Sequence, residues 1–246
     1  MKYQQKPFEL IGKTVYFLKE KVLVFGDMHL GYEYMLNEMG LNFPQQQIEQ
    51  TFKEVEETIK TAMEMNGKLN KIVFLGDIKH YFAFNKGERN IVLNLLDLLE
   101  KYVKRDDIIM IKGNHEKFNL IKDKDFLDYY LYKDLAFIHG DIEITEVFSD
   151  KIKYILMGHL HPAITLRDPQ KIRAEKYKCF LVGKYKNKNI IILPSFLPLV
   201  EGTSLNEHID DGNCFIPEKN LLNFNIFVVG QQNQVLDFGK LKKLSM

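Results

Sequence analysis

Six of the seven histidines of this 246-residue chain lie in five short polar clusters, and each cluster also contains a glycine. The clusters are Gly26-Asp27-Met28-His29, Gly76-Asp77-Ile78-Lys79-His80, Gly113-Asn114-His115-Glu116, His139-Gly140-Asp141 and Gly158-His159-Leu160-His161. Histidine nitrogens and carboxylate oxygens without sulfur form a ligand set that suits Mn²⁺, Fe, Zn²⁺ or Ni²⁺, whereas Ca²⁺ prefers oxygen throughout. The clusters therefore predict a metal site.

The first three clusters each follow directly on a short apolar run, at residues 22–25, 72–75 and 108–111. Ligands in open α/β sheets gather at the carboxyl ends of the strands, so we expect these clusters to meet in one crevice. The seven expected ligands are Asp27, His29, Asp77, Asn114, His139, His159 and His161. Seven ligands are too many for one ion, and two ions about 3.5–4 Å apart need a bridging carboxylate.

No single cluster decides this interpretation. A Gly-Asp step or a lone Asp-x-His at a strand end is common and has structural explanations. The Gly-His-x-His step is more specific, because side chains alternate along an extended segment and His159 and His161 would lie on one side of it. The prediction rests on the order of the five clusters and on their shared position after strands.

Composition excludes several other classes of protein. The net charge of +1 argues against a broadly basic nucleic-acid surface. Two cysteines without Cys-x-x-Cys spacing argue against a thiolate zinc site or a disulfide framework. We find no signal-peptide pattern at the N-terminus and no run of roughly 20 apolar residues. We therefore expect a soluble, cytoplasmic protein that does not bind membranes.

The first half of the chain alternates strand and helix patterns. We expect strands at residues 14–18, 21–25, 71–75 and 107–111, and helices at residues 44–65 and 89–103. Strand–helix–strand order is typical of a parallel βαβ region whose helices cover the sheet.

The second half has little helical periodicity. We expect strands at residues 135–138, 154–157, 177–182, 189–193, 225–229 and 235–238, with one short helix at residues 143–148. These strands predict a second, mixed sheet packed on the first. We find no linker, so we expect one domain spanning residues 1–246 of the α/β class, with two mixed sheets packed face to face and flanked by helices.

The five clusters resemble the motifs of the calcineurin-like metallophosphoesterase superfamily. Its pattern is Asp-x-His, Gly-Asp-x-x-Asp/Asn/His, Gly-Asn-His-Asp/Glu, a later His and Gly-His-x-His, and every element is present from Asp27 to His161. The resemblance implies a β-sandwich flanked by helices. It also implies a hydrolase that uses two divalent metal ions, Mn²⁺ first and Fe, Zn²⁺ or Ni²⁺ as alternatives, and a metal-bridging water that attacks phosphorus.

The resemblance also implies a role for each residue of the motifs. One ion would be bound by Asp27, His29 and His161. The other would be bound by Asn114, His139 and His159. Asp77 would bridge the two ions. His115 would not bind metal and would stabilise the transition state or protonate the leaving group. Asp141 and Glu116 would support the ligand histidines by hydrogen bonds.

His80 indicates the branch of the superfamily. Many family phosphatases carry an acidic residue three positions after the bridging aspartate, whereas break-repair nuclease subunits and ligase-associated bacterial relatives carry histidine there. This resemblance favours a phosphodiesterase, with single-stranded or structured nucleic acid as a substrate and an ATPase, helicase or ligase as a partner. His80 would hydrogen-bond the scissile phosphate or, alternatively, orient Asp77 or a ligand histidine. We expect the neighbouring Lys79 at the surface.

Two other functions stay open. A phosphomonoesterase acting on nucleotides or phosphoproteins would use the same ligands, although His80 in place of an acidic residue counts against it. A non-catalytic scaffold could keep the fold, but scaffolding branches tend to lose ligands and this chain retains them all.

Overall fold

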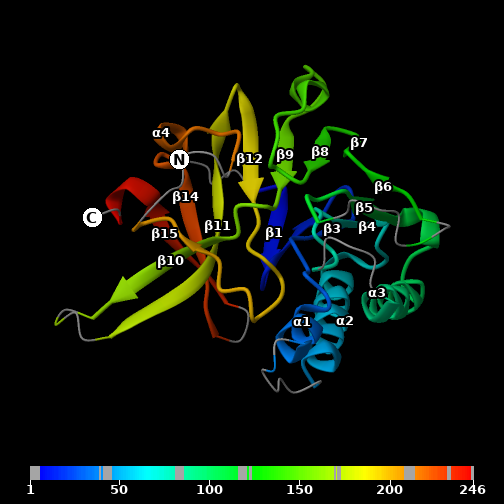
Figure 1. Ribbon diagram of the computed structural model, residues 1–246. Coiled ribbons are helices and arrows are strands. Elements are labelled where there is room, and N and C mark those ends of the chain that lie inside the picture. Colours follow the sequence, from blue (N-terminus) through cyan, green and yellow to red (C-terminus); the bar gives the residue numbers. More distant parts are fainter. Residues whose placement is uncertain are drawn as a thin grey trace.

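The computed structural model describes residues 6–38, 40, 46–80, 86–115, 121, 124–168, 170, 173–207, 214–231 and 234–244. Two β-sheets pack face to face, and the two longest helices, at residues 46–66 and 86–99, cover the outer face of the smaller sheet (Figure 1). This is the α/β sandwich of two mixed sheets that the sequence predicts.

The smaller sheet has six strands in the order β1 to β6. The strands are β1 (Phe8–Ile11), β2 (Thr14–Phe17), β3 (Val22–Phe25), β4 (Lys71–Phe74), β5 (Ile108–Ile111) and β6 (Phe126–Leu127). Strands β3, β4 and β5 run parallel, which confirms the predicted parallel βαβ region, and β1–β2–β3 form an antiparallel meander. Strand β1 was not predicted from the sequence.

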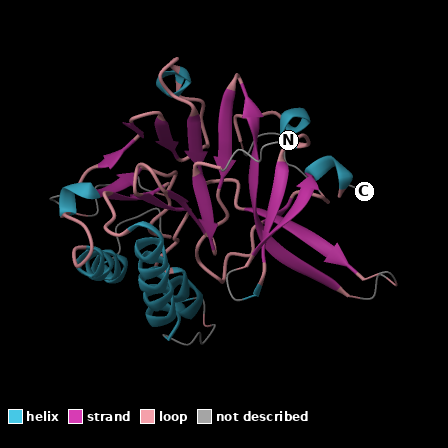
Figure 2. Ribbon diagram, turned by 180° about the vertical axis from the view of Figure 1, so that it is seen from behind, coloured by secondary structure: helices cyan, strands magenta, loops and turns pink. Residues whose placement is uncertain are grey.

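The larger sheet is mixed, as predicted. Its strands are β7 (Tyr129–Tyr132), β8 (Leu135–Ile138), β9 (Tyr154–Met157), β10 (Pro162–Arg167), β11 (Ala174–Tyr185), β12 (Lys188–Ile192), β13 (Thr203–Ser204), β14 (Asn225–Val229) and β15 (Val235–Lys240). Strands β8, β9 and β12 run parallel, whereas β10, β11 and β12 are antiparallel. Seen from behind, the β10–β11 hairpin extends away from the helices (Figure 2).

The helices are α1 (Tyr32–Glu38), α2 (Gln46–Asn66), α3 (Lys86–Leu99) and the short α4 (Glu218–Leu221). Helix α3 begins three residues before its predicted start and ends four residues before its predicted end, because residues 100–103 form a turn. The predicted helix at residues 143–148 is a 3₁₀ turn at Thr145–Phe148, and two further 3₁₀ turns lie at Arg105–Asp107 and Leu241–Lys243. Helix α1, β7 and β10 were not predicted.

Alternating side chains along the strands build the core in three layers. In β3, Leu23 and Phe25 pack with the helices, whereas Val22 and Val24 pack between the two sheets. Both groups are fully buried, so the strand is apolar throughout, as is typical of a strand covered on both faces. A third cluster fills the outer face of the larger sheet. The sandwich therefore holds the strand ends rigidly, and the polar clusters follow those ends.

Candidate metal centre

The polar clusters lie in the loops that follow five strands, β3, β4, β5, β8 and β9. Backbone hydrogen bonds join neighbouring loops: His29 N–H donates to the Asp77 carbonyl over 2.8 Å, and Gly158 N–H donates to the His139 carbonyl over 2.9 Å. Because both sheets present the carboxyl ends of parallel strands at this edge, the side chains of Asp27 and His161 meet there although they are far apart in sequence.

The first group of contacts surrounds the fully buried Asp27. Its Oδ2 accepts a hydrogen bond from the His159 backbone N–H at 2.9 Å and lies 3.2 Å from His161 Nε2. The Nε2 atoms of His29 and His161 lie 3.2 Å apart. Asp27, His29 and His161 therefore lie together at one end of the centre.

The second group surrounds Asp77. Its Oδ1 accepts a hydrogen bond from the His115 backbone N–H at 3.0 Å, and its Oδ2 lies 3.6 Å from His139 Nε2. His139 Nε2 in turn lies 3.0 Å from His159 Nδ1. His139 Nδ1 donates to the Leu75 carbonyl over 2.9 Å, so Nε2 carries the lone pair when the ring is neutral.

The contacts of Asp27 and its neighbours fit a divalent cation. Asp27 Oδ1 and His29 Nδ1 are buried and form no hydrogen bond within the described part of the chain, although Asp27 Oδ1 lies 3.3 Å from His139 Nδ1. Buried polar atoms are nearly always hydrogen-bonded, and buried carboxylates are paired or bind metals. Ligand atoms of Asp77, His139 and His159 lie within 4.8 Å of one another, and so do those of His29, His80 and His115.

Burial keeps three of these imidazoles neutral. It is the main cause that lowers the pKa of His29 well below its ordinary value, and it lowers the pKa of both His159 and His80 to about 4. Neighbouring imidazoles lower the pKa of each further. A neutral imidazole offers a lone pair to a cation, so low pKa values favour metal binding near neutral pH.

The two carboxylates respond differently to the same environment. Burial alone would raise the pKa of Asp27, but the imidazoles of His161, His139 and His29 hold it below its ordinary value. Burial raises the pKa of Asp77, and the charge of Asp27 adds to this effect. Burial lowers the pKa of His139, but the charges of Asp27 and Asp77 reverse the shift and raise it. Two carboxylates this close together would both be stabilised by a cation.

Four residues of the centre have left-handed backbone conformations. The φ angles are 44° for His29, 42° for Asp77, 62° for His159 and 44° for His161. Such conformations cost non-glycine residues about 1–3 kcal/mol each and persist where the surrounding structure imposes them, often at functional sites. The loops are therefore strained in a way that fixes the direction of these side chains.

Two glycines of the motifs allow the carboxylates to approach the neighbouring loops. A Cβ on Gly113 would lie 2.2 Å from Asp77 Oδ1, and a Cβ on Gly158 would lie 2.4 Å from Asp27 Oδ2. Both separations are too short for any side chain. Glycine is therefore required at both positions for close packing.

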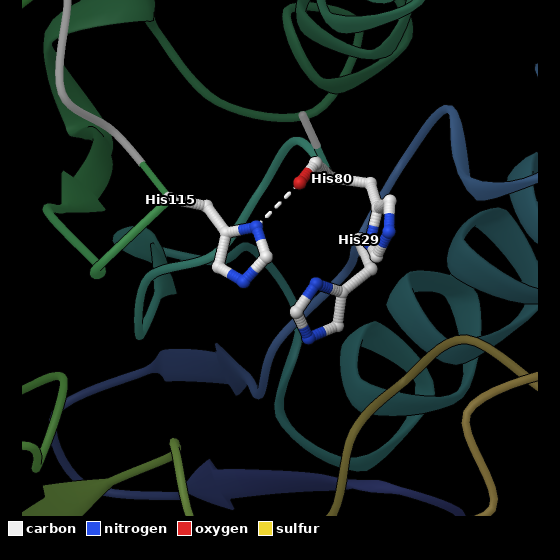
Figure 3. Close-up of side chains that lie close together, drawn as sticks. All are labelled: His29, His80 and His115. Carbon is white, nitrogen blue, oxygen red and sulfur yellow. Dashed lines mark hydrogen bonds between the residues drawn. The ribbon is translucent and has the colours of Figure 1, made fainter. Parts of the chain in front are cut away.

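His115 and His80 lie beside His29 at the open side of the centre (Figure 3). His115 Nδ1 donates to the His80 carbonyl, which leaves Nε2 3.8 Å from Asp77 Oδ2. The His80 ring makes an edge contact with Tyr32, with ring centroids 4.6 Å apart, and its Nε2 lies 3.2 Å from Met35 Sδ. His115 therefore faces Asp77, whereas one nitrogen of His80 faces helix α1.

The remaining predicted site residues are placed less centrally. Asn114 is exposed, and the described contacts do not join its side chain to either cluster. Asp141 is half-buried, and its charge favours the protonated forms of His139 and His159. Glu116 lies outside the described residues.

Two residues that support the centre were not identified from the sequence. Lys79, expected at the surface, is buried because residues 78–80 pair with the loop after β3, and its Nζ donates to the His115 carbonyl over 2.7 Å. Glu88, in the first turn of α3, is completely buried and accepts a hydrogen bond from the His80 N–H at 3.0 Å. An acidic residue in a first helical turn is common, so the pattern around Glu88 carried no specific signal.

Comparison with known families identifies the chain. The family model of calcineurin-like phosphoesterases matches residues 20–206, which include every cluster described above. The chain belongs to the calcineurin-like phosphoesterase family. This family hydrolyses phosphoric esters with divalent metals, and the clusters of histidine and aspartate found here are potential binding sites for such metals. No curated protein sequence matches the chain.

One solved structure shares the fold of this calcineurin-like chain, and two others show a weaker likeness. The nuclease MPE of Pseudomonas putida is 16% identical, covers 94% of both chains and has a TM-score of 0.59. An archaeal phosphodiesterase is 10% identical over 88% of this chain and 98% of its own, with a TM-score of 0.36. Vps29 from Entamoeba histolytica, as a D62A mutant, is 13% identical over 89% of this chain and 99% of its own, with a TM-score of 0.35.

In the described part of the chain, no helix has the length and apolar character needed to cross a membrane.

Proposed function

We propose that this chain is a two-metal-dependent phosphodiesterase. The observation that carries the proposal is that the site brings together two pairs of close imidazole nitrogens and two buried carboxylates. The pairs are His29 with His161 beside Asp27, and His139 with His159 beside Asp77. Two such pairs suit two ions.

In this proposal, one ion is held by Asp27, His29 and His161, and the other by His139, His159 and Asn114. Asp77 is the shared ligand. Mn²⁺ is the first ion to test, and Fe, Zn²⁺ and Ni²⁺ are alternatives, because mixed imidazole and carboxylate ligands without sulfur suit all four. When bound, a metal pair lowers the pKa of a water and neutralises charge on the phosphate oxygens.

His115 is the proposed acid or electrostatic contributor. Its Nδ1–H donates to the His80 carbonyl, so Nε2, 3.8 Å from Asp77 Oδ2, is the nitrogen directed toward the centre. A proton on Nε2 would be donated to a phosphate oxygen or to the leaving oxygen. The Lys79 hydrogen bond to the His115 carbonyl holds this loop in place.

Several features support a diester rather than a monoester as the substrate. His80 stands where an acidic residue is common in family phosphatases, and its ring lines the same cavity as His29 and His115. The fold is shared with a nuclease, which is an analogy at the level of fold only. A single-stranded or structured nucleic acid is the proposed substrate, with an ATPase, helicase or ligase as a partner.

The experiment compares bis-p-nitrophenyl phosphate with p-nitrophenyl phosphate, using metal-free protein supplied with Mn²⁺. We expect a higher kcat/KM for the diester. A preference for the monoester would instead identify a phosphatase. Metal binding without hydrolysis of either ester would identify a scaffold.

A further inference from the structure

A cavity of about 500 Å³ opens beside the metal centre, and we refer to it as the side cavity. One wall consists of imidazoles of the centre. The described lining also includes Tyr32, whose ring contacts that of His80, and the segment 199–202, which we call the β12–β13 wall. The volume of the side cavity lies within the roughly 300–1,000 Å³ that is typical of small-molecule sites. The cavity is therefore large enough for an organic group attached to a phosphate at the centre.

The part of the lining outside the imidazoles is mostly apolar. Tyr32, Leu199 and Val200 are half-buried and offer an aromatic ring and two aliphatic side chains. Among the described lining residues, Glu201 is the one carboxylate, and none is lysine or arginine. Lys176 Nζ, at the edge of the cavity, lies 3.5 Å from Glu201 Oε2 and donates to the Gly202 carbonyl over 3.3 Å, so this carboxylate is already paired with a cation. A carboxylate can accept hydrogen bonds from hydroxyl or amino groups.

Hydrogen bonds from the half-buried Lys178 and the buried Ser195 hold the β12–β13 wall and the residues just before it in place. Lys178 Nζ donates to the Ser195 carbonyl over 2.8 Å and to the Leu197 carbonyl. Ser195 Oγ donates to the Val200 carbonyl over 2.9 Å. The Phe196 N–H donates to the Asp27 carbonyl over 2.7 Å, which ties the same segment to a residue of the centre. The cavity is thus largely pre-formed, as binding sites for small molecules usually are.

We propose that the side cavity is a subsite for a nucleoside attached to the phosphate. The inference rests on the proposed function and names its substrate class. A nucleobase stacks on Tyr32 and packs against Leu199 and Val200, and the sugar or base donates hydrogen bonds to Glu201. A nucleoside matches this wall because it combines a flat apolar face with neutral donors.

The test is a comparison of two ligands that carry the same charged group, thymidine 5′-monophosphate and methyl phosphate. Their dissociation constants are measured by calorimetry on the Mn²⁺-loaded protein. We expect thymidine 5′-monophosphate to bind at least about tenfold more tightly, within the range of one base–aromatic contact. The readout is binding, so it is independent of whether the protein hydrolyses diesters.

Matched variants assign the difference to the side cavity. Leu199→Asp and Tyr32→Leu should bring the two dissociation constants close together. Leu236→Asp places the same charge on the exposed strand β15, and Tyr32→Phe keeps an aromatic face, so both should retain the preference for the nucleotide. Equal affinity of the unmodified protein for both ligands, including failure to bind either, would overturn the proposal.

The natural nucleoside ester could be the end of a nucleic-acid strand or a small molecule. The salt dependence of binding distinguishes these two sources. A dinucleoside monophosphate presents one phosphate, whereas an oligothymidylate strand presents many. If the natural ligand is the end of a nucleic-acid strand, the oligothymidylate should bind more tightly and lose affinity steeply with salt. If it is a small ester, the two ligands should bind alike.

Discussion

The Nε2 atoms of His29 and His161 lie 3.2 Å apart, although 132 residues separate them in the sequence. His29 follows a strand of the smaller sheet and His161 follows a strand of the larger one. Contact between two ring nitrogens requires a proton or a cation between them, because two lone pairs repel. The packing of one sheet on the other therefore creates this half of the proposed metal site.

Gly158→Ala should disrupt the centre without removing a ligand. The new Cβ would lie 2.4 Å from Asp27 Oδ2, so the carboxylate must move. A displacement of about 1 Å can lower the rate about 10²-fold, and we expect a loss of that size in diester hydrolysis together with weaker Mn²⁺ binding. The control is Gly230→Ala, whose Cβ would have only an ordinary 3.6 Å contact with the Gln234 carbonyl. A folded Gly158→Ala protein that binds Mn²⁺ normally would show that the position of Asp27 is unimportant.

His115→Ala should separate catalysis from metal binding. We expect the turnover of bis-p-nitrophenyl phosphate to fall by roughly 10²–10⁴, the usual range for one acid or electrostatic contributor. The Mn²⁺ content, measured by elemental analysis after dialysis, should stay unchanged. Loss of an ion would mean that His115 is a ligand, as its proximity to His29 and His80 would allow.

His80→Ala tests the preference for diesters. The His80 carbonyl that fixes His115 belongs to the backbone and remains in this variant. The variant therefore removes only the ring. If this ring contacts the diester, its removal should lower kcat/KM for bis-p-nitrophenyl phosphate more than for p-nitrophenyl phosphate. If both esters are affected equally, His80 does not discriminate between them, and the main argument for a diester is lost.

Lys178→Met tests the support of the β12–β13 wall. Lys178 Nζ donates to oxygens of Ser195 and Leu197, and loss of the donor should lower the free energy of unfolding by about 1–3 kcal/mol. Burial, with the charge of Lys13 added, lowers the pKa of Lys178 to about 6 from 10.5. Between these pH values the unfolded chain binds more protons, so the stability contributed by Lys178 rises with pH and is lost as pH falls.

Denaturant unfolding of the unmodified protein and of Lys178→Met at about pH 6 and about pH 9 measures this effect. We expect the stability gap between the two proteins to widen at the higher pH. Parallel pH profiles would show that the hydrogen bonds keep Lys178 charged in the folded protein.

The strands that carry the centre could be predicted because their signals are local. Strands β8 and β9 have the predicted bounds, and the bounds of β3, β4 and β5 lie within one residue of the predicted ones. Buried parallel strands form uninterrupted apolar runs, and polar residues directly after such runs indicate a site.

Other features depend on contacts between distant parts of the chain. Lys79 is buried because its segment pairs with the loop after β3, and the alternation of side chains around it does not reveal that pairing. Glu88 occupies the space that Gly31 leaves open, where a Cβ would lie 2.5 Å from its Cγ. The exposed position of Asn114 likewise follows from the path of its loop rather than from its motif.

The most direct test of the two-metal account is a titration of metal-free protein with Mn²⁺ while the hydrolysis of bis-p-nitrophenyl phosphate is followed. The account predicts no activity without metal and a rise that levels off at two equivalents of Mn²⁺ per chain. Activity that levels off at one equivalent, or that persists with a chelator present, would contradict it.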